Sequence, residues 1–148
     1  MVAQLDDREI ASHLFNRRWE LLEKTRDPDD DVELLTAAFA SRYHWLTVGD
    51  VDTRIISDWM VARAAAALGD GELSIRYAKR AHAAAQETTV PDWLSASCAE
   101  GVARAYAASG DVTEFNNWSA LTERLISVIA DPDDRGLIAS QFADIETP

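Results

Sequence analysis

Apolar residues recur at helical spacing through most of the chain. In residues 4–25, for example, Ile10, Leu14 and Leu21 stand four and seven positions apart, which places them on one face of an amphipathic helix. No stretch of strand length alternates apolar and polar residues, so we expect no sheet. The pattern predicts an all-α protein of about seven antiparallel helices.

Segments rich in Asp, Gly and Pro interrupt this pattern and mark the helix boundaries. Asp favours the first turn of a helix, Pro disfavours a helical residue before it, and glycines such as Gly49, Gly69 and Gly110 favour a left-handed turn after a helix end. Helices are expected at residues 4–25, 32–48, 53–68, 72–87 and 92–109, and from residue 112 to about 129. Residues 1–148 thus form a single predicted domain, with an N-terminal helical pair (1–48), repeat-like pairs (about 53–88 and 92–129) and a C-terminal capping helix (132–145).

One ten-residue segment occurs twice. Residues 61–70 read VARAAAALGD and residues 102–111 read VARAYAASGD, so eight of ten positions are identical at an offset of 41 residues. The shared Val, Arg and Gly-Asp in register favour a duplication over the chance similarity of alanine-rich helices. Small residues let two helices approach closely and Gly-Asp permits a tight reversal, so the repeat predicts stacked helical hairpins.

The repeated residues resemble the tetratricopeptide repeat family over roughly residues 55–129. Ala62 and Gly69-Asp70 match its first helix and turn, and the second helix of this unit matches at Ser74, Ile75, Tyr77 and Ala81. The resemblance implies helical hairpins stacked into an α–α superhelix.

The second unit matches the family through Ala103, Tyr106 and Gly110-Asp111, but Phe115 and Thr122 stand where the family prefers alanine. The offset of 41 residues also exceeds the family period of about 34 residues. We therefore expect an irregular, compact array. Residues 40–50 additionally resemble a group of short bacterial repeat proteins, and this likeness implies no activity.

In the tetratricopeptide repeat family the first helix of each pair lines a concave groove, and the resemblance places Arg63 and Arg104 at equivalent positions in that groove. Trp59 and Glu100 stand four residues earlier, on the same helix faces. Two guanidinium groups beside an exposed indole are suited to hold a carboxylate or phosphate. The alternative interpretation is that Arg63 and Arg104 pair with Asp58, Glu100 or other acids and brace the helices.

The charge of the chain narrows the possible partners. With 26 acidic and 14 basic residues the formal net charge is −12, so the average surface potential repels nucleic acid and anionic membranes. Cys98 is the only cysteine, which excludes an intramolecular disulfide. Because no apolar run has the length of a membrane span or a signal peptide core, we expect a cytoplasmic protein.

Motifs of catalysis or cofactor binding are absent from the sequence. It contains no nucleophile elbow, phosphate-binding glycine loop or dinucleotide fingerprint. His44 is far in sequence from His13 and His82, so no metal spacing is present. We expect no cofactor, no metal and no catalytic residue, and Cys98 in its alanine-rich helix is interpreted as a small buried residue.

Three functional hypotheses remain. The first is a non-enzymatic module whose groove, with Trp59, Arg63, Glu100 and Arg104, binds a peptide or a segment of a partner protein. The second is a small-molecule or enzymatic pocket built around Tyr43, His44, Trp45 and Trp59. The third is a homodimeric scaffold. The sequence also leaves open whether residues 1–48 form a further repeat pair or only a cap.

Overall fold

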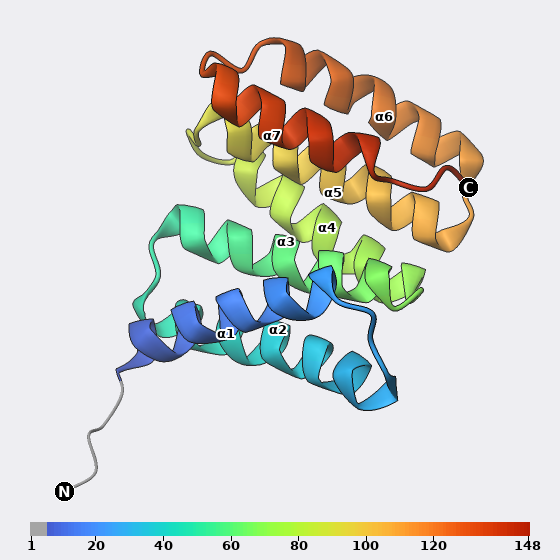
Figure 1. The fold of residues 1–148 in the computed structure, drawn as a ribbon. Helices are drawn as coiled ribbons and strands as arrows, with labels where there is room; N and C mark the ends of the chain where they lie inside the picture. Colours follow the sequence, from blue (N-terminus) through green and yellow to red (C-terminus); the bar gives the residue numbers. More distant parts are fainter. Residues whose placement is uncertain (1–5) are drawn as a thin grey trace, which may run out of the picture.

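The computed structural model describes residues 6–148, which form seven α-helices and no strand (Figure 1). The helices are α1 (Asp7–Glu23), α2 (Pro28–Val48), α3 (Val51–Ala67), α4 (Gly71–Gln86), α5 (Asp92–Ser109), α6 (Val112–Ser127) and α7 (Pro132–Ala143). The predicted all-α class and number of helices are confirmed. Residues 4 and 5, which the prediction placed in the first helix, lie outside the described residues.

Aspartate side chains determine where most helices begin. Asp6 accepts a hydrogen bond from the backbone N–H of Glu9 at 2.8 Å, and Asp27 accepts one from Asp30 at 2.8 Å. Because Asp27 caps the helix and Pro28 suits its first turn, α2 begins four residues before the predicted residue 32. Four other helices have the same kind of cap, at Asp50, Asp70, Asp111 and Asp131.

Two of the three glycines predicted to end helices adopt a left-handed backbone. The φ angle is +75° at Gly69 and +78° at Gly110, values that strain any residue with a Cβ. Gly49 ends its helix as predicted, but its backbone is not left-handed, because its φ is −76°. Space requires the glycine there instead, since a Cβ at Gly49 would lie 2.5 Å from the carbonyl oxygen of Trp45.

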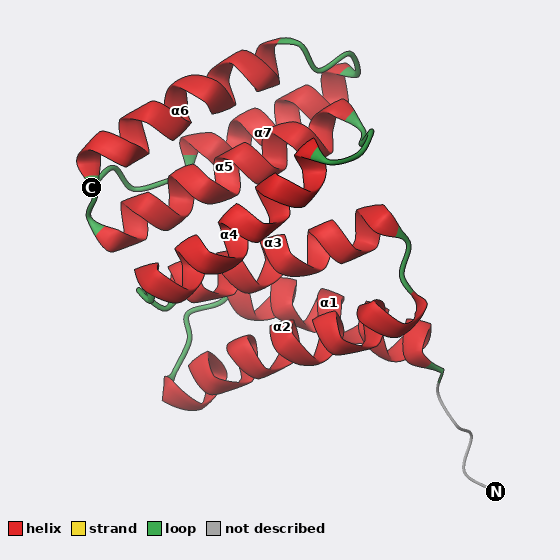
Figure 2. Ribbon diagram, turned by 180° about the vertical axis from the view of Figure 1, so that it is seen from behind, coloured by secondary structure: helices red, strands yellow, loops and turns green. Residues whose placement is uncertain are grey.

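Consecutive helices pack as hairpins, α1 with α2, α3 with α4 and α5 with α6 (Figures 1 and 2). The hairpins begin at residues 7, 51 and 92, so the 41-residue offset is the spacing of the second and third hairpins. The second helix of each hairpin packs on the first helix of the next one, and α7 packs against α5 and α6. Residues 7–48 therefore form a further hairpin of the same stack.

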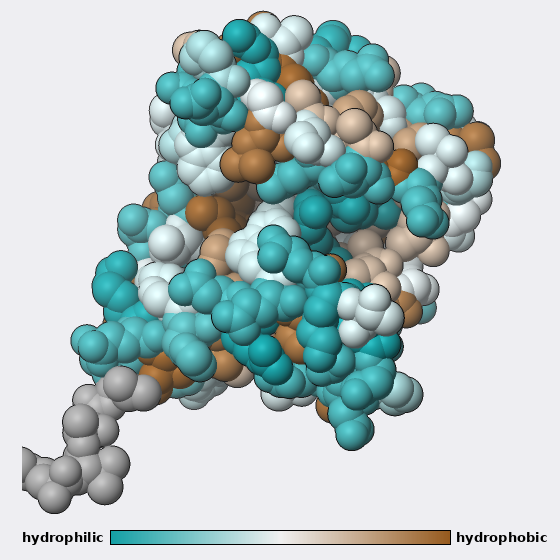
Figure 3. All heavy atoms as spheres, viewed as in Figure 1, coloured by the Kyte–Doolittle hydropathy of each residue, from teal (hydrophilic) through white to brown (hydrophobic). Residues whose placement is uncertain are grey.

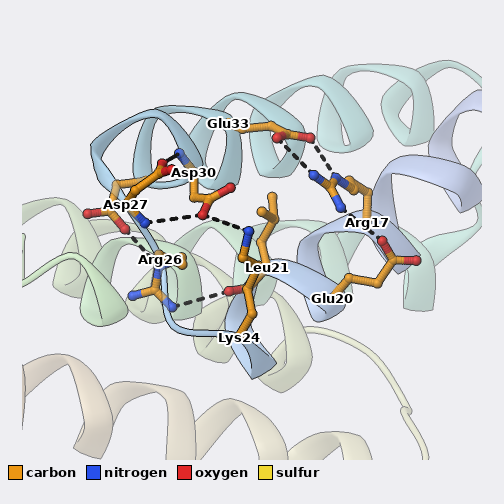
Figure 4. A network of polar contacts seen from close by, with 9 residues as sticks. Arg17, Glu20, Leu21, Lys24, Arg26, Asp27, Asp30 and Glu33 are labelled. Atoms are coloured by element: carbon orange, nitrogen blue, oxygen red, sulfur yellow. Dashed lines mark hydrogen bonds and ion pairs between the residues drawn. The ribbon is translucent and has the colours of Figure 1, made fainter.

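Ion pairs join α1 to α2 (Figure 4). Arg17 donates from Nε to Glu33 Oε1 at 2.6 Å, and Lys24 Nζ lies 2.8 Å from Asp30 Oδ2. Arg26 Nε donates to the Asp31 carboxylate, and its two terminal nitrogens donate to backbone carbonyls. Exposed pairs of this kind contribute about 0–1 kcal/mol each, so apolar burial stabilises this hairpin more.

The core changes in character along the stack. Leucines fill the junction of α1, α2 and α3, where Leu21 and Leu34 are fully buried. Between α3 and α5 the buried residues are mostly small, which lets the backbones approach closely. This set includes Ala62, Ala103 and Gly101. Each fully buried leucine contributes roughly 1.5–3 kcal/mol, and the alanines contribute by close packing of the helices.

Candidate functional site

An open groove with a volume of about 570 Å³ lies on one face of the stack. The ends of α1, α3 and α5 form its floor, and residues 144–148, which follow α7, form a wall. Figure 3 shows this face hollowed between α1 and α7, with polar residues around the hollow. Arg26, Arg63 and Arg104 line the groove together with four alanines, Ala66, Ala67, Ala107 and Ala108. Three guanidinium groups above a floor of small residues suit an anionic ligand.

Glu100 lies beneath the groove and connects the two arginines of the repeat. Arg104 donates from Nε to Glu100 Oε1 at 2.9 Å, and Arg63 Nη1 lies 3.8 Å from the same oxygen. Glu100 itself is 1% exposed. Asp58, the other acid considered for bracing, pairs with Arg42 at 2.6 Å. Arg63 and Arg104 thus line the groove and also share a carboxylate that joins α3 to α5.

Trp59 is buried rather than exposed to the groove, so the expectation of an open stacking surface is wrong. The residue is 7% exposed, because Trp19 of α1 covers it with the ring centroids 6.0 Å apart. On the other side a Cβ at position 101 would lie 2.9 Å from Trp59 Cδ1, so Gly101 is needed for the indole to pack against α5. The guanidinium of Arg63 lies 5.6 Å from the Trp59 ring and 5.1 Å from the Trp19 ring.

Arg18 of α1 is a further charged residue of this region, and it is fully buried. Its guanidinium carbon lies 4.2 Å from the ring centroid of Trp19 and 4.9 Å from that of Phe15. Within residues 6–148, its Nε, Nη1 and Nη2 have no hydrogen-bond partner. Burial, and to a lesser extent the charge of Arg63, lowers the pKa of Arg18 to about 9. Burial likewise lowers the pKa of Arg63 to about 10, so both groups are protonated at neutral pH.

Arg18 is not among the site residues predicted from the sequence, although a signal for it is present there. Arg18 stands four residues after Leu14 and three before Leu21, which puts it in phase with the apolar face of α1. A charged residue in that phase indicates either a boundary of the apolar face or a buried cation. The structure shows a buried cation.

The non-helical residues 144–148 lie against the arginines of the groove. Arg104 donates from Nη2 to the carbonyl oxygen of Gln141 at 2.7 Å and so fixes the last turn of α7 beside the groove. Although burial lowers the pKa of Arg63, the negative charges of Glu100 and Asp144 partly oppose this effect. A short acidic segment of the chain therefore already occupies one side of the groove.

Tyr43, His44 and Trp45 lie on α2, away from Trp59. Tyr43 is 71% exposed, and His44 Nδ1 lies 2.6 Å from Asp7 Oδ1. Trp45 lines a separate hollow of about 260 Å³ between α1, α2 and α3, and Trp59 is not part of its lining. The four residues of the predicted small-molecule pocket are thus not gathered around one hollow.

Other possible sites are limited. Burial raises the pKa of the Cys98 thiol to about 12, so this cysteine is not a thiolate at neutral pH. In the described part of the chain no three His, Cys, Asp or Glu residues are grouped to hold a metal ion. None of the helices in residues 6–148 has the length and apolar character needed to cross a membrane.

The outer face of α2 carries an exposed apolar hollow of about 830 Å³. Val32, Leu35, Phe39 and Leu68 contribute its apolar part, and Val32 is 68% exposed. In the described part of the chain this hollow is an exposed apolar surface, and a homodimer of this chain would additionally require it to be self-complementary.

Comparison with known proteins finds no relative of this chain. No family model, no curated protein and no solved structure matches the chain.

Proposed function

We propose that the chain is a non-enzymatic helical-repeat module, of the tetratricopeptide repeat type, that binds an acidic peptide segment of a partner protein in its groove. The observation that carries this proposal is the position of Arg63 and Arg104. They come from equivalent places in successive hairpins and line one open groove, along which the acidic residues 144–148 already lie.

The arginines of the groove floor favour an acidic ligand. Arg26, Arg63 and Arg104 line it, and Glu100 beneath them supplies one negative charge. Carboxylates pair with guanidinium groups through two parallel hydrogen bonds, which gives orientation as well as affinity. The floor of the groove is therefore cationic, whereas its wall carries Asp144 and Glu146 and the whole chain has a net charge of −12.

The shape of the groove favours an extended segment. Alanines from the ends of α3 and α5 form much of the floor, so a bound backbone is able to approach both helices closely. The wall made by residues 144–148 provides a second surface, and an added segment would lie beside it. This arrangement suits an extended peptide better than a compact small molecule.

A peptide array tests the proposal. Eight-residue peptides with zero to four glutamates, and matched peptides with glutamine, are probed with the full chain, and the strongest binder is titrated by fluorescence anisotropy. Replacing both Arg63 and Arg104 with alanine should weaken binding by about tenfold or more for each lost charge-assisted contact. The matched control replaces Arg76 and Arg124, which lie outside the groove. Undiminished affinity in the R63A/R104A variant would refute the proposal.

A further inference from the structure

Five apolar side chains form a stripe along the outer face of α2. Val32, Tyr43 and Leu46 are between 44% and 71% exposed. Leu35 and Phe39 are partly buried, and together with Val32 they line the apolar hollow of about 830 Å³. The stripe runs for about 21 Å, since an α-helix rises 1.5 Å per residue. In residues 6–148 no other helix has more than one large hydrophobic side chain that is exposed.

The equivalent helices of the other two hairpins have a polar outer face. The exposed residues of α4 include Glu72, Arg76, Lys79 and Arg80, and those of α6 are mainly polar or charged. The helix α2 belongs to the hairpin at one end of the stack (Figures 1 and 2). Terminal repeats of a stack normally have a polar outer face, which keeps the protein soluble. The apolar stripe of α2 therefore favours contact with another protein surface.

The spacing of the stripe is the same in both directions along the helix. Its intervals are three, four, four and three residues, so Phe39 is at its centre. Two copies of α2 that lie antiparallel and cross at Phe39 place each half of one stripe against the opposite half of the other. The pairs are Val32 with Leu46, Leu35 with Tyr43, and Phe39 with Phe39. A two-fold symmetric interface requires a surface that matches itself in this way.

The charges at the two ends of α2 favour the same antiparallel orientation. In the first turn Asp30 and Asp31 pair with basic residues of the same copy, and Asp29 is exposed. At the last turn the exposed Arg8 and Arg54 donate to backbone carbonyl oxygens of α2 at 3.2 and 3.3 Å. Arg8 also lies near the aspartate that caps α3. Antiparallel pairing brings the aspartates of one copy to the end that carries the arginines of the other, and it also sets the helix dipoles in opposite directions.

We propose that the stripe of α2 is a homodimer interface, in which two copies of the chain pair antiparallel through this helix about a two-fold axis at Phe39. None of the five stripe residues lines the groove that contains Arg63 and Arg104. The dimer interface is therefore independent of the proposed binding of an acidic peptide.

The size of the contact sets its expected strength. A contact of one helix with its copy over about 21 Å is smaller than most stable interfaces, which bury about 1,200–2,000 Å². We therefore expect a dimer in equilibrium with the monomer, with a dissociation constant between about 1 and 100 μM.

Sedimentation equilibrium of the full chain from about 1 to 500 μM tests the proposal. The mass should rise from 16.4 kDa toward twice this value. V32E/Y43E should raise the dissociation constant at least tenfold, because pairing would bury carboxylates without a partner. The matched control V112E/L137E adds the same charges at exposed apolar residues of α6 and α7, and it should dimerise like the wild type. If V32E/Y43E loses helix content in circular dichroism, V32S/Y43S replaces it.

Disulfide crosslinking tests the antiparallel register. The variants V32C and L46C are oxidised with copper phenanthroline, each alone and as an equimolar mixture, while the native Cys98 is buried. The mixture should give a disulfide-linked dimer, because position 32 of one copy lies opposite position 46 of the other. Each variant alone should give at least fivefold less, because its two cysteines lie about 21 Å apart along the helices, beyond the reach of a disulfide.

Three results would overturn the proposal: a monomer over the whole concentration range, undiminished association of V32E/Y43E, or equal crosslinking of the single variants and the mixture. The first result would leave the stripe to a different protein. The second would assign the dimer to another face of the stack, and the third would exclude the antiparallel register.

Discussion

Replacing Arg18 with methionine should stabilise the protein although Arg18 is fully buried. Lowering its pKa from 12.5 to about 9 corresponds to about 5 kcal/mol against the charged form, at about 1.4 kcal/mol per unit. Attraction to the rings of Trp19 and Phe15 returns about 1–2 kcal/mol each. The altered shape of methionine costs up to about 1.5 kcal/mol. The free energy of unfolding should therefore rise by roughly 0–3 kcal/mol at pH 7.

The pH dependence of this difference has a defined sign. The unfolded chain keeps the Arg18 proton up to pH 12.5, whereas the folded chain releases it at about pH 9. Below pH 9 the wild type carries the full cost of the buried charge, and above it the wild type gains stability from this group as the pH rises. The advantage of R18M should thus be constant at pH 7–8 and shrink above pH 9.

Urea unfolding followed by far-UV circular dichroism measures this difference. R17M is the control, because Arg17 forms exposed ion pairs with Glu20 and Glu33 and its loss should cost no more than about 1 kcal/mol. If R18M instead loses about 3 kcal/mol or more, as expected when a buried ion pair is broken, Arg18 has a permanent partner and the reasoning fails.

Three other substitutions or reactions probe the stack. G101A should cost about 1–3 kcal/mol and alter tryptophan emission, since the new Cβ would lie 2.9 Å from Trp59 Cδ1; G136A, where nothing lies within 4 Å, should be neutral or slightly stabilising in the same urea titration. Cys98 should react with Ellman's reagent only as fast as the chain unfolds, because the thiol is buried with a pKa of about 12; rapid labelling of the folded protein would contradict this. D27A should lower the thermal midpoint through loss of about 1 kcal/mol of capping, and an unchanged midpoint would argue against that cap.

Helix number and order were predictable because the signals for them are local. Aspartates at helix starts and Gly-Asp turns act within one turn of the backbone, so they have the same meaning in any tertiary setting. The start of α2 was predicted four residues too late, because the prediction relied on the first apolar residue. The local signal is the cap at Asp27 followed by Pro28, which begins the helix before its apolar residues appear. The equivalent positions of Arg63 and Arg104 were predictable from the duplicated segment.

The interior of the site was less predictable because it depends on how α1 packs. Residues Trp59 and Arg63 share a helix face by spacing alone, but only the position of α1 decides that Trp19 covers that face. The sequence of α3 carries no information about this cover. Burial of Trp59 and the role of Gly101 are therefore properties of the assembled stack.

The three hairpins together explain why a polar interior exists at this junction. Counted from the helix starts, Phe15 and Trp19 of α1 correspond to Trp59 and Arg63 of α3 and to Glu100 and Arg104 of α5. The same face thus changes from aromatic through mixed to ionic along the stack. Arg18 stands next to the aromatic end, where it finds rings on its faces and no acid at its edge. Because Glu100 lies two hairpins further along and is engaged by Arg104, Arg18 has no counter-charge among the described residues.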